Sequence, residues 1–240
     1  MQITIDDVLH ILDKKTNGGC TSKCGTYVIA ETGERVFIKF FLKRGIHLSE
    51  IKKEVCILEQ VKDIDGGEKY FPQIKSFGEF DYEEFQYFIV FELCKGRELF
   101  GCKTSPQQKE HIFSEMCKAI ELLHKNNIVH CDLKLENVIY HKRTGEIKIV
   151  DFGGSNINGT CLKNLKIFTT PYIAPPEYMN YLTDTSVEFC VIPSFDIWSL
   201  GKCYFKLYAL PCETFVELPR SKIIHENFLC DAHLRKMKID

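Results

Sequence analysis

Two short clusters in this chain carry side chains that could do chemistry together. Residues 130–137 read HCDLKLEN, and residues 151–153 read DFG. The clusters supply a carboxylate (Asp132), an ammonium (Lys134), a carboxamide and a second carboxylate. Transfer of a phosphoryl group leaves little covalent work for a protein and depends on positioning and charge neutralisation. These residue types and spacings therefore favour transfer of a phosphoryl group from Mg-ATP to a hydroxyl.

Each group in the two clusters has an expected role in that chemistry. Asp132 would accept a hydrogen bond from the substrate hydroxyl and take its proton late, and Lys134 would stabilise charge on the phosphoryl oxygens. Asn137 and Asp151 would supply the hard oxygen ligands that Mg²⁺ prefers. The alternative is that Asp132 and Asn137 cap turns and Asp151 begins a loop, as such residues often do. The joint spacing favours the catalytic interpretation.

A lysine in an apolar run adds to this site. Residues 36–40 read VFIKF and predict a β-strand that leaves a hairpin turn. Lys39 in such a strand is costly unless it is paired, so we expect it to meet the α- and β-phosphates of ATP and a helix carboxylate. Apolar residues recur at helical spacing from Leu48 to Val61. The candidate carboxylates of this helix are Glu50, Glu54 and Glu59.

With these motifs in place, the chain resembles a eukaryotic-type protein kinase from about residue 15 to about residue 212. Further segments match the family in the same order. They are YFIVFEL at 87–93, KGREL at 95–99, VIY at 138–140, IKIV at 147–150, YIAPPE at 172–177 and DIWSLG at 196–201. The resemblance implies an α+β, two-lobed protein-kinase fold. Residues 1–240 would form one kinase domain, with an antiparallel-sheet N-lobe over about 1–93 and a mainly helical, truncated C-lobe over about 94–240.

The resemblance also assigns an ATP site. It selects Glu54 as the partner of Lys39, because the paired glutamate of the family precedes an Ile-Leu pair, although Glu50 remains possible. Phe91 would be the gatekeeper beside the adenine. The other nucleotide contacts implied by the resemblance are Gly19 and Gly25 in the phosphate loop, the backbone of Glu92 and Cys94 at the adenine edge, Glu98 at the ribose and Ile139 under the adenine ring.

Several residues depart from the family pattern. The aligned phosphate loop reads CTSKCG at 20–25 and keeps only its third glycine, which weakens the backbone approach to phosphates. Phe37 stands where the family has a small alanine and would narrow the adenine pocket. Cys131 replaces the arginine that pairs with a phosphorylated activation loop. We therefore expect activity without activation-loop phosphorylation. An extra proline leaves open whether Thr169 or Thr170 contacts the catalytic residues.

The resemblance leaves three classes of function. An ATP-dependent protein kinase is favoured, and Lys134 indicates serine/threonine specificity. A pseudokinase that scaffolds or inhibits a partner would fit the degraded glycine loop and Phe37, but it would usually lack one of the motif residues. A small-molecule kinase fits the segments at 172–177 and 196–201 less well, because those segments build a platform for a protein substrate.

The end of the chain and its composition add further expectations. Residues 201–210 predict a continued buried helix, and few residues follow it. A short C-lobe would leave apolar surface exposed, so we expect that a partner could cover it. The compact C-lobe also resembles that of kinases encoded by large DNA viruses. Arg220 and Arg235 are candidate partners of Glu177. A net charge of −2 implies no attraction to nucleic acid or membrane. No signal peptide is read, so we expect an intracellular protein, cytoplasmic or nuclear and in the host cell if viral.

The chain has 12 cysteines but no C-x-x-C pair. A tetrahedral zinc site would therefore need distant ligands. We expect reduced thiols, many of them buried as small apolar groups. Cys20 and Cys24 are the exceptions, because in the phosphate loop they could form a redox switch on ATP access.

Overall fold

The computed structural model describes residues 2–16, 22–44, 46–163, 166–184 and 188–209. The chain divides between Lys95 and Gly96 into two compact units. The first unit is built mainly from a sheet and the second mainly from helices. Gly19, Cys20, Arg220 and Arg235 lie outside the described residues.

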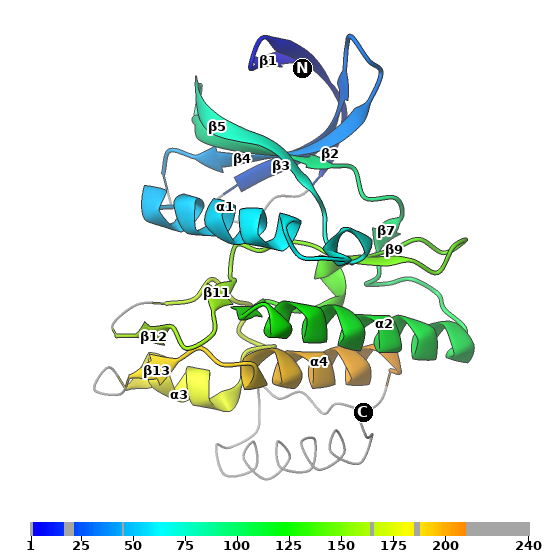
Figure 1. Cartoon of the computed structure of the whole chain (residues 1–240), viewed down its shortest axis with the longest axis vertical. Helices are drawn as coiled ribbons and strands as arrows, with labels where there is room; N and C mark the ends of the chain where they lie inside the picture. The colour runs from blue at the N-terminus through cyan, green and yellow to red at the C-terminus, as the bar shows by residue number, and fades with distance from the viewer. Residues whose placement is uncertain (1, 17–21, 45, 164–165, 185–187, 210–240) are drawn as a thin grey trace. The chain divides into compact units, whose positions relative to one another are not determined.

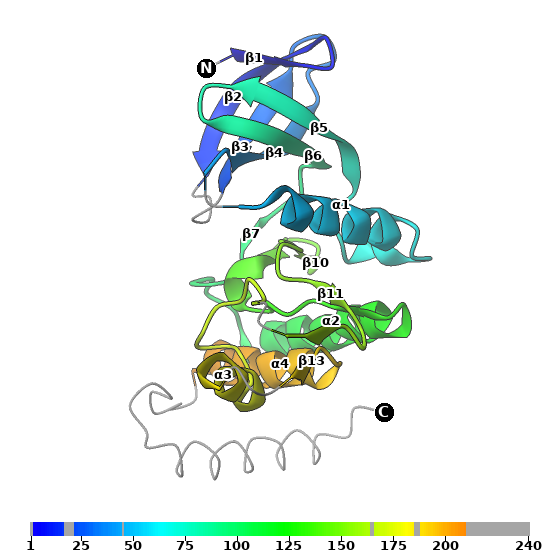
Figure 2. The same ribbon diagram turned by 90° about the vertical axis from the view of Figure 1, so that its left-hand side faces the viewer.

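The first unit is built on a six-stranded, curled antiparallel sheet (Figures 1 and 2). Its order is β1-β2-β3-β4-β6-β5. The strands are β1 (Gln2–Ile5), β2 (Val8–Thr16), β3 (Ser22–Ile29), β4 (Arg35–Leu42), β5 (Ile74–Tyr82) and β6 (Phe85–Glu92). The strand predicted around residues 36–40 is thus confirmed as β4, next to β3 and β6 in the sheet.

The two faces of β4 carry side chains with different surroundings. Val36, Ile38 and Phe40 are buried in an apolar cluster with residues of the neighbouring strands. Because side chains alternate along a strand, Phe37 and Lys39 point to the opposite face. Helix α1 (Leu48–Lys62) meets that face, since Lys39 bonds to a residue of α1. The helix predicted from Leu48 to Val61 is confirmed, and Figure 2 shows it lying along the sheet.

The second unit is mainly helical, with short strands between the helices. Helix α2 (Pro106–Lys125) lies beside α4 (Ser194–Leu207), and α3 (Pro176–Thr183) is a shorter helix near them (Figure 1). One sheet has the order β10-β9-β7, and two strand pairs are β11-β8 and β12-β13. These strands are β7 (Arg97–Glu98), β8 (Ile128–Val129), β9 (Val138–Tyr140), β10 (Ile147–Ile149), β11 (Asn156–Ile157), β12 (Cys161–Leu162) and β13 (Phe189–Cys190).

The start of α2 follows from its sequence. The Ser105 side chain accepts from the backbone of Gln108, and the Gln108 side chain accepts from the backbone of Ser105, which forms a capping box. Pro106 occupies the first turn, where its missing N–H costs nothing. The buried face of α2 packs on α4, with the rings of Phe113 and Tyr204 at 5.0 Å. The helix predicted from Ser105 to Leu123 is therefore confirmed.

The α+β architecture predicted from the sequence, with an antiparallel sheet in the first unit and mainly helices in the second, is confirmed. The helix expected to run through residue 210 ends at Leu207. Among the described residues, no helix combines the length and the hydropathy needed to cross a membrane.

The prediction that the cysteines are reduced is wrong for one pair. Cys161 and Cys190 form a disulfide. They are direct partners in the antiparallel pairing of β12 with β13, with Cα atoms 4.0 Å apart. The sequence gives no sign of this pair because the cysteines are separated by 29 positions and meet only through the path of the chain.

Candidate catalytic site

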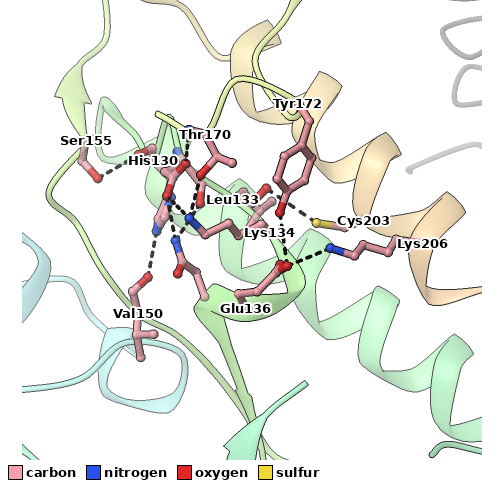
Figure 3. Close-up of polar contacts among 12 residues, drawn as sticks. His130, Leu133, Lys134, Glu136, Val150, Ser155, Thr170, Tyr172, Cys203 and Lys206 are labelled. Carbon is pink, nitrogen blue, oxygen red and sulfur yellow. Dashed lines mark hydrogen bonds and ion pairs between the residues drawn. The ribbon is translucent and has the colours of Figure 1, made fainter. Parts of the chain in front are cut away.

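The carboxylate of Asp132 is the centre of a hydrogen-bonded group in the second unit, and two of its partners, Lys134 and Thr170, are labelled in Figure 3. Its Oδ1 accepts from the Thr170 amide at 2.7 Å, and its Oδ2 accepts from Lys134 Nζ at 2.7 Å. Asn137 Nδ2 donates to Asp132 Oδ2 at 3.1 Å and to its backbone oxygen at 2.9 Å. Lys134 also donates to the Thr170 hydroxyl at 2.7 Å. The structure thus brings together three of the predicted site residues.

The extra proline left open which of two threonines contacts the catalytic residues, and the contacts of Asp132 and Lys134 decide it. Thr170, not Thr169, contacts both Asp132 and Lys134. The Thr169 hydroxyl is buried and has no hydrogen-bond partner within the described part of the chain. The role of the Thr170 amide in holding Asp132 was not predicted, because the sequence signal concerned only side chains.

A buried carboxylate at the start of α4 holds the catalytic loop in place. Asp196 accepts from the backbone amides of His130 at 2.7 Å and Cys131 at 2.8 Å, and from His124 Nε2 at 2.9 Å. Two successive amides thus point at one carboxylate, and the next bond of the chain has a left-handed φ of 63° at Cys131. This contact explains why the segment at 196–201 accompanies the HCDLKLEN cluster in the sequence.

His130 braces the loop rather than taking part in proton transfer. Its Nδ1 accepts from the Asp132 amide at 3.2 Å, so the proton is on Nε2, which lies 3.3 Å from the Val150 oxygen. The ring packs on Phe152 of the DFG cluster at 5.1 Å. Both ring nitrogens are therefore occupied by backbone groups.

Asn137 and Asp151 supply the oxygen atoms predicted to bind Mg²⁺. The Val150 amide donates to the backbone oxygen of Asn137 at 2.8 Å, which ties the chain just before Asp151 to Asn137. Asp151 is exposed and has a φ of 68°. Because Asn137 donates through Nδ2, its amide oxygen is the group left to face a cation. The described residues contain no cluster of three His, Cys, Asp or Glu. Two hard oxygens completed by phosphate and water fit Mg²⁺.

Lys39 and Glu54 form an ion pair in the first unit. Lys39 Nζ lies 2.7 Å from Glu54 Oε1, and the two side chains are only 13% and 3% exposed. Glu50 pairs with Lys53 of its own helix at 2.9 Å, so the structure favours Glu54 among the candidates. A desolvated pair of this kind is strongly destabilised if one partner is removed alone. The geometry thus holds one ammonium on the sheet face that also carries Phe37.

The other predicted nucleotide residues of the first unit lie along β3, β4 and β6, except Cys94, which follows β6 by two positions. Phe37 and Phe91 are opposite each other on β4 and β6, with ring centroids 6.4 Å apart. The Glu92 amide donates to the Gln73 oxygen at 2.9 Å, so an adenine would meet Glu92 through its carbonyl. Cys94 is partly buried. A side chain at Gly25 would lie 3.1 Å from Leu12, from the Lys14 carbonyl and from Tyr27, which explains the glycine by packing alone.

Glu98 and Ile139 are neighbours in the second unit. They pair across β7 and β9 in the same sheet. Glu98 is exposed and Ile139 is half-buried, as a ribose contact and an adenine contact would require. Their roles stay predictions, as do those of Glu92 and Cys94.

The segment between Asp151 and Glu177, here called the activation segment, packs on Cys131. The Cys131 side chain is fully buried in one apolar cluster with Leu162, Ile167 and Ala174 of this segment and with Tyr178 of α3. The Tyr178 hydroxyl accepts from the Ile167 amide at 2.7 Å. An apolar cluster therefore occupies the place at which the sequence replaces arginine by cysteine.

Comparison with known proteins agrees with this geometry. Residues 14–236 match the protein kinase domain. The chain belongs to the protein kinase family.

Curated relatives carry matching names. The chain is similar to a probable serine/threonine-protein kinase KIN1 homolog of Encephalitozoon cuniculi, at 33% identity over 59% of this chain and 24% of that protein. It is also similar to calcium-dependent protein kinase 5 of Plasmodium falciparum, at 29% identity over 87% of this chain and 35% of that protein. A third relative is the serine/threonine protein kinase OSK3 of Oryza sativa subsp. indica, at 31% identity over 84% of this chain and 39% of that protein. The chain spans well under half the length of these relatives.

Proposed function

We propose that this chain is a protein serine/threonine kinase that transfers the γ-phosphoryl group of Mg-ATP to hydroxyls of protein substrates. The observation that carries the proposal is the Asp132 carboxylate, held on both oxygens by Thr170 and Lys134. A carboxylate fixed in this way presents an acceptor to a substrate hydroxyl without reorganising. Family membership and the names of the relatives support the same reaction.

Each residue then has a defined task. Asp132 accepts a hydrogen bond from the substrate hydroxyl and takes its proton as the new bond forms. Lys134, which already bridges Asp132 and Thr170, stabilises negative charge on the transferred group. Lys39, oriented by Glu54, binds the α- and β-phosphates.

Asn137 and Asp151 would hold Mg²⁺ through oxygen. When bound, the ion neutralises charge on the phosphate oxygens. The chain contributes by keeping these two residues in register through the Val150–Asn137 backbone bond.

Transfer of labelled γ-phosphate from Mg-ATP to casein, histone and the chain itself tests this proposal. We expect transfer by wild type and a loss of at least about a hundredfold in Asp132→Asn, because the general base is removed. Asp65→Asn, at an exposed position of the first unit, is the matched control and should keep full activity. Phosphoamino-acid analysis should find phosphoserine or phosphothreonine. Absence of transfer by folded wild type would favour the pseudokinase alternative.

The kinase is also proposed to work without phosphorylation of its activation segment. The support is the apolar cluster that the buried Cys131 side chain forms with Leu162, Ile167 and Ala174 of the activation segment. Thr170 contacts Asp132 through its amide and Lys134 through its hydroxyl. The segment is thus fixed by burial and by direct bonds to the catalytic loop.

Phosphatase treatment tests this second point. The purified chain would be treated with a broad-specificity phosphatase, checked by mass spectrometry and assayed after phosphatase removal. We expect unchanged kcat. A loss of activity that returns on rephosphorylation at Thr169 or Thr170 would contradict the proposal.

A further inference from the structure

A lysine of α4 fills a small cation-binding site beside the catalytic loop. Lys206 Nζ lies 2.8 Å from Glu136 Oε1, and its ammonium is 4.2 Å from the centre of the Phe100 ring and 5.2 Å from that of Tyr172. The Tyr172 hydroxyl donates to the same Glu136 oxygen at 3.1 Å. Figure 3 shows Tyr172 and Lys206 converging on Glu136. One carboxylate and two aromatic rings are the groups that recognise an ammonium or guanidinium.

The charges of this site are balanced within the chain. Burial raises the pKa of the Glu136 carboxyl, but the hydrogen bonds from Lys206 and Tyr172 and the Lys206 charge outweigh it, so the net pKa is lowered. Burial and the neighbouring Glu136 charge raise the pKa of Tyr172, which keeps its phenol protonated as a donor. Glu136 is therefore an anion whose charge is already compensated by Lys206.

The site is open to solvent and next to the residues that handle the substrate hydroxyl. Phe100 and Tyr172 are 51% and 43% exposed, and the Lys206 and Glu136 side chains are 35% and 27% exposed. Tyr172 follows Thr170, which binds Asp132, by two positions, and Glu136 belongs to the same loop as Asp132. A bound substrate segment would thus pass this surface.

We infer that Lys206 is a specificity-determining residue that occupies the site where a basic side chain of a substrate would otherwise bind. This inference rests on the proposed kinase function. In wild type the site has no net negative charge to offer, so arginine or lysine flanking the acceptor brings no gain. The substrate class is therefore proteins whose recognition does not depend on a basic residue at that position. Removing the Lys206 charge leaves Glu136, Tyr172 and Phe100 as a vacant receptor for a substrate cation.

The test compares acceptor peptides that carry arginine, alanine or glutamate at each position flanking one serine. Lys206→Met keeps the unbranched stem over the rings and removes the charge. We expect Lys206→Met to favour arginine over alanine at one flanking position by roughly fivefold to twentyfold in kcat/KM, as one partly exposed ion pair and a cation–π contact would give. Wild type and Lys206→Arg should show no such preference. The double variant Lys206→Met/Glu136→Gln should lose it.

A matched control removes a lysine from the same helix. Lys202 lies over Trp198, with its ammonium 5.3 Å from the ring centre. Lys202→Met therefore lowers the charge of α4 equally and should leave peptide preference unchanged. An equal gain in Lys202→Met would show a general charge effect and overturn the inference.

Equilibrium binding separates this inference from the proposed function. Fluorescence anisotropy with the same labelled peptides requires no phosphate transfer. Tighter binding of the arginine peptide to Lys206→Met would support the site even if no variant transferred phosphate, in which case only the proposed function would fail. Active enzyme with no arginine preference in Lys206→Met, or a wild type that already prefers arginine through Glu136, would overturn the inference.

Discussion

Replacement of Asp196 by alanine should remove the side chain that holds the catalytic loop in place and should lower the free energy of unfolding. The carboxylate accepts from two buried backbone amides, of His130 and Cys131, and from His124. Leaving a buried donor unsatisfied costs about 1–3 kcal/mol, so two amides alone predict a loss of about 4 kcal/mol in the free energy of unfolding. Asp196→Asn keeps one acceptor oxygen and turns an N–H towards the other amide, so about half of that loss is expected.

Urea unfolding followed by circular dichroism measures both losses. Glu110→Ala, which removes an exposed carboxylate from α2, is the control and should change stability by less than about 0.5 kcal/mol. Folded Asp196→Asn should also lose roughly tenfold or more in kcat, because the loop that carries Asp132 is no longer fixed. A loss below about 1 kcal/mol in Asp196→Ala would refute the reasoning, since it would mean that the two amides find other acceptors.

Three further predictions concern stability. Folding lowers the pKa of Glu136, so this carboxylate contributes to the free energy of unfolding above its ordinary pKa of about 4.3, and the contribution is lost as pH falls through the folded pKa. Glu136→Gln should therefore weaken the loss of stability at acid pH, measured by urea unfolding at a series of pH values. Cys190→Ser should lower the free energy of unfolding by about 3 kcal/mol without reductant, because the bond to Cys161 closes a long loop, and by much less with reductant. Ser105→Ala should cost about 1 kcal/mol in urea unfolding, through loss of the capping box of α2.

The parts of the site that local periodicity fixes were predictable. Lys39 sits in a strand whose alternation is visible in the sequence, and Glu54 lies on the buried face of a helix with clear apolar spacing. Their ion pair follows once the strand and the helix pack together. Thr170 could not be separated from Thr169, because an extra proline changes the register and only the path of the chain decides which residue reaches Asp132.

Contacts between distant segments were not predictable in the same way. The partnership of Cys161 with Cys190 depends on the register of two very short strands, which no periodicity signals. The Glu136–Lys206 pair joins a loop to the end of a helix. A sequence signal existed in the lysine on the last turn of α4, but nothing in the spacing names its partner.

Helix α4 supports the catalytic loop along its whole length. At its start Asp196 binds the amides of His130 and Cys131, and further along the Cys203 thiol donates to the Leu133 oxygen at 3.6 Å. Burial raises the pKa of Cys203, which keeps the thiol protonated as a donor. At the end of the helix Lys206 binds Glu136 (Figure 3).

The contacts occur in the same order along the helix and along the loop. From Asp196 to Lys206 the helix rises about 15 Å, so one rigid element fixes both ends of the loop that contains Asp132 and Lys134. The residue that anchors the catalytic loop and the residue that we infer to set substrate preference thus lie on one helix. Because they are separated by more than about 10 Å and bind different partners, the effects of their substitutions on the free energy of unfolding should add in a double-mutant cycle. A coupling energy above about 0.5 kcal/mol would contradict this expectation.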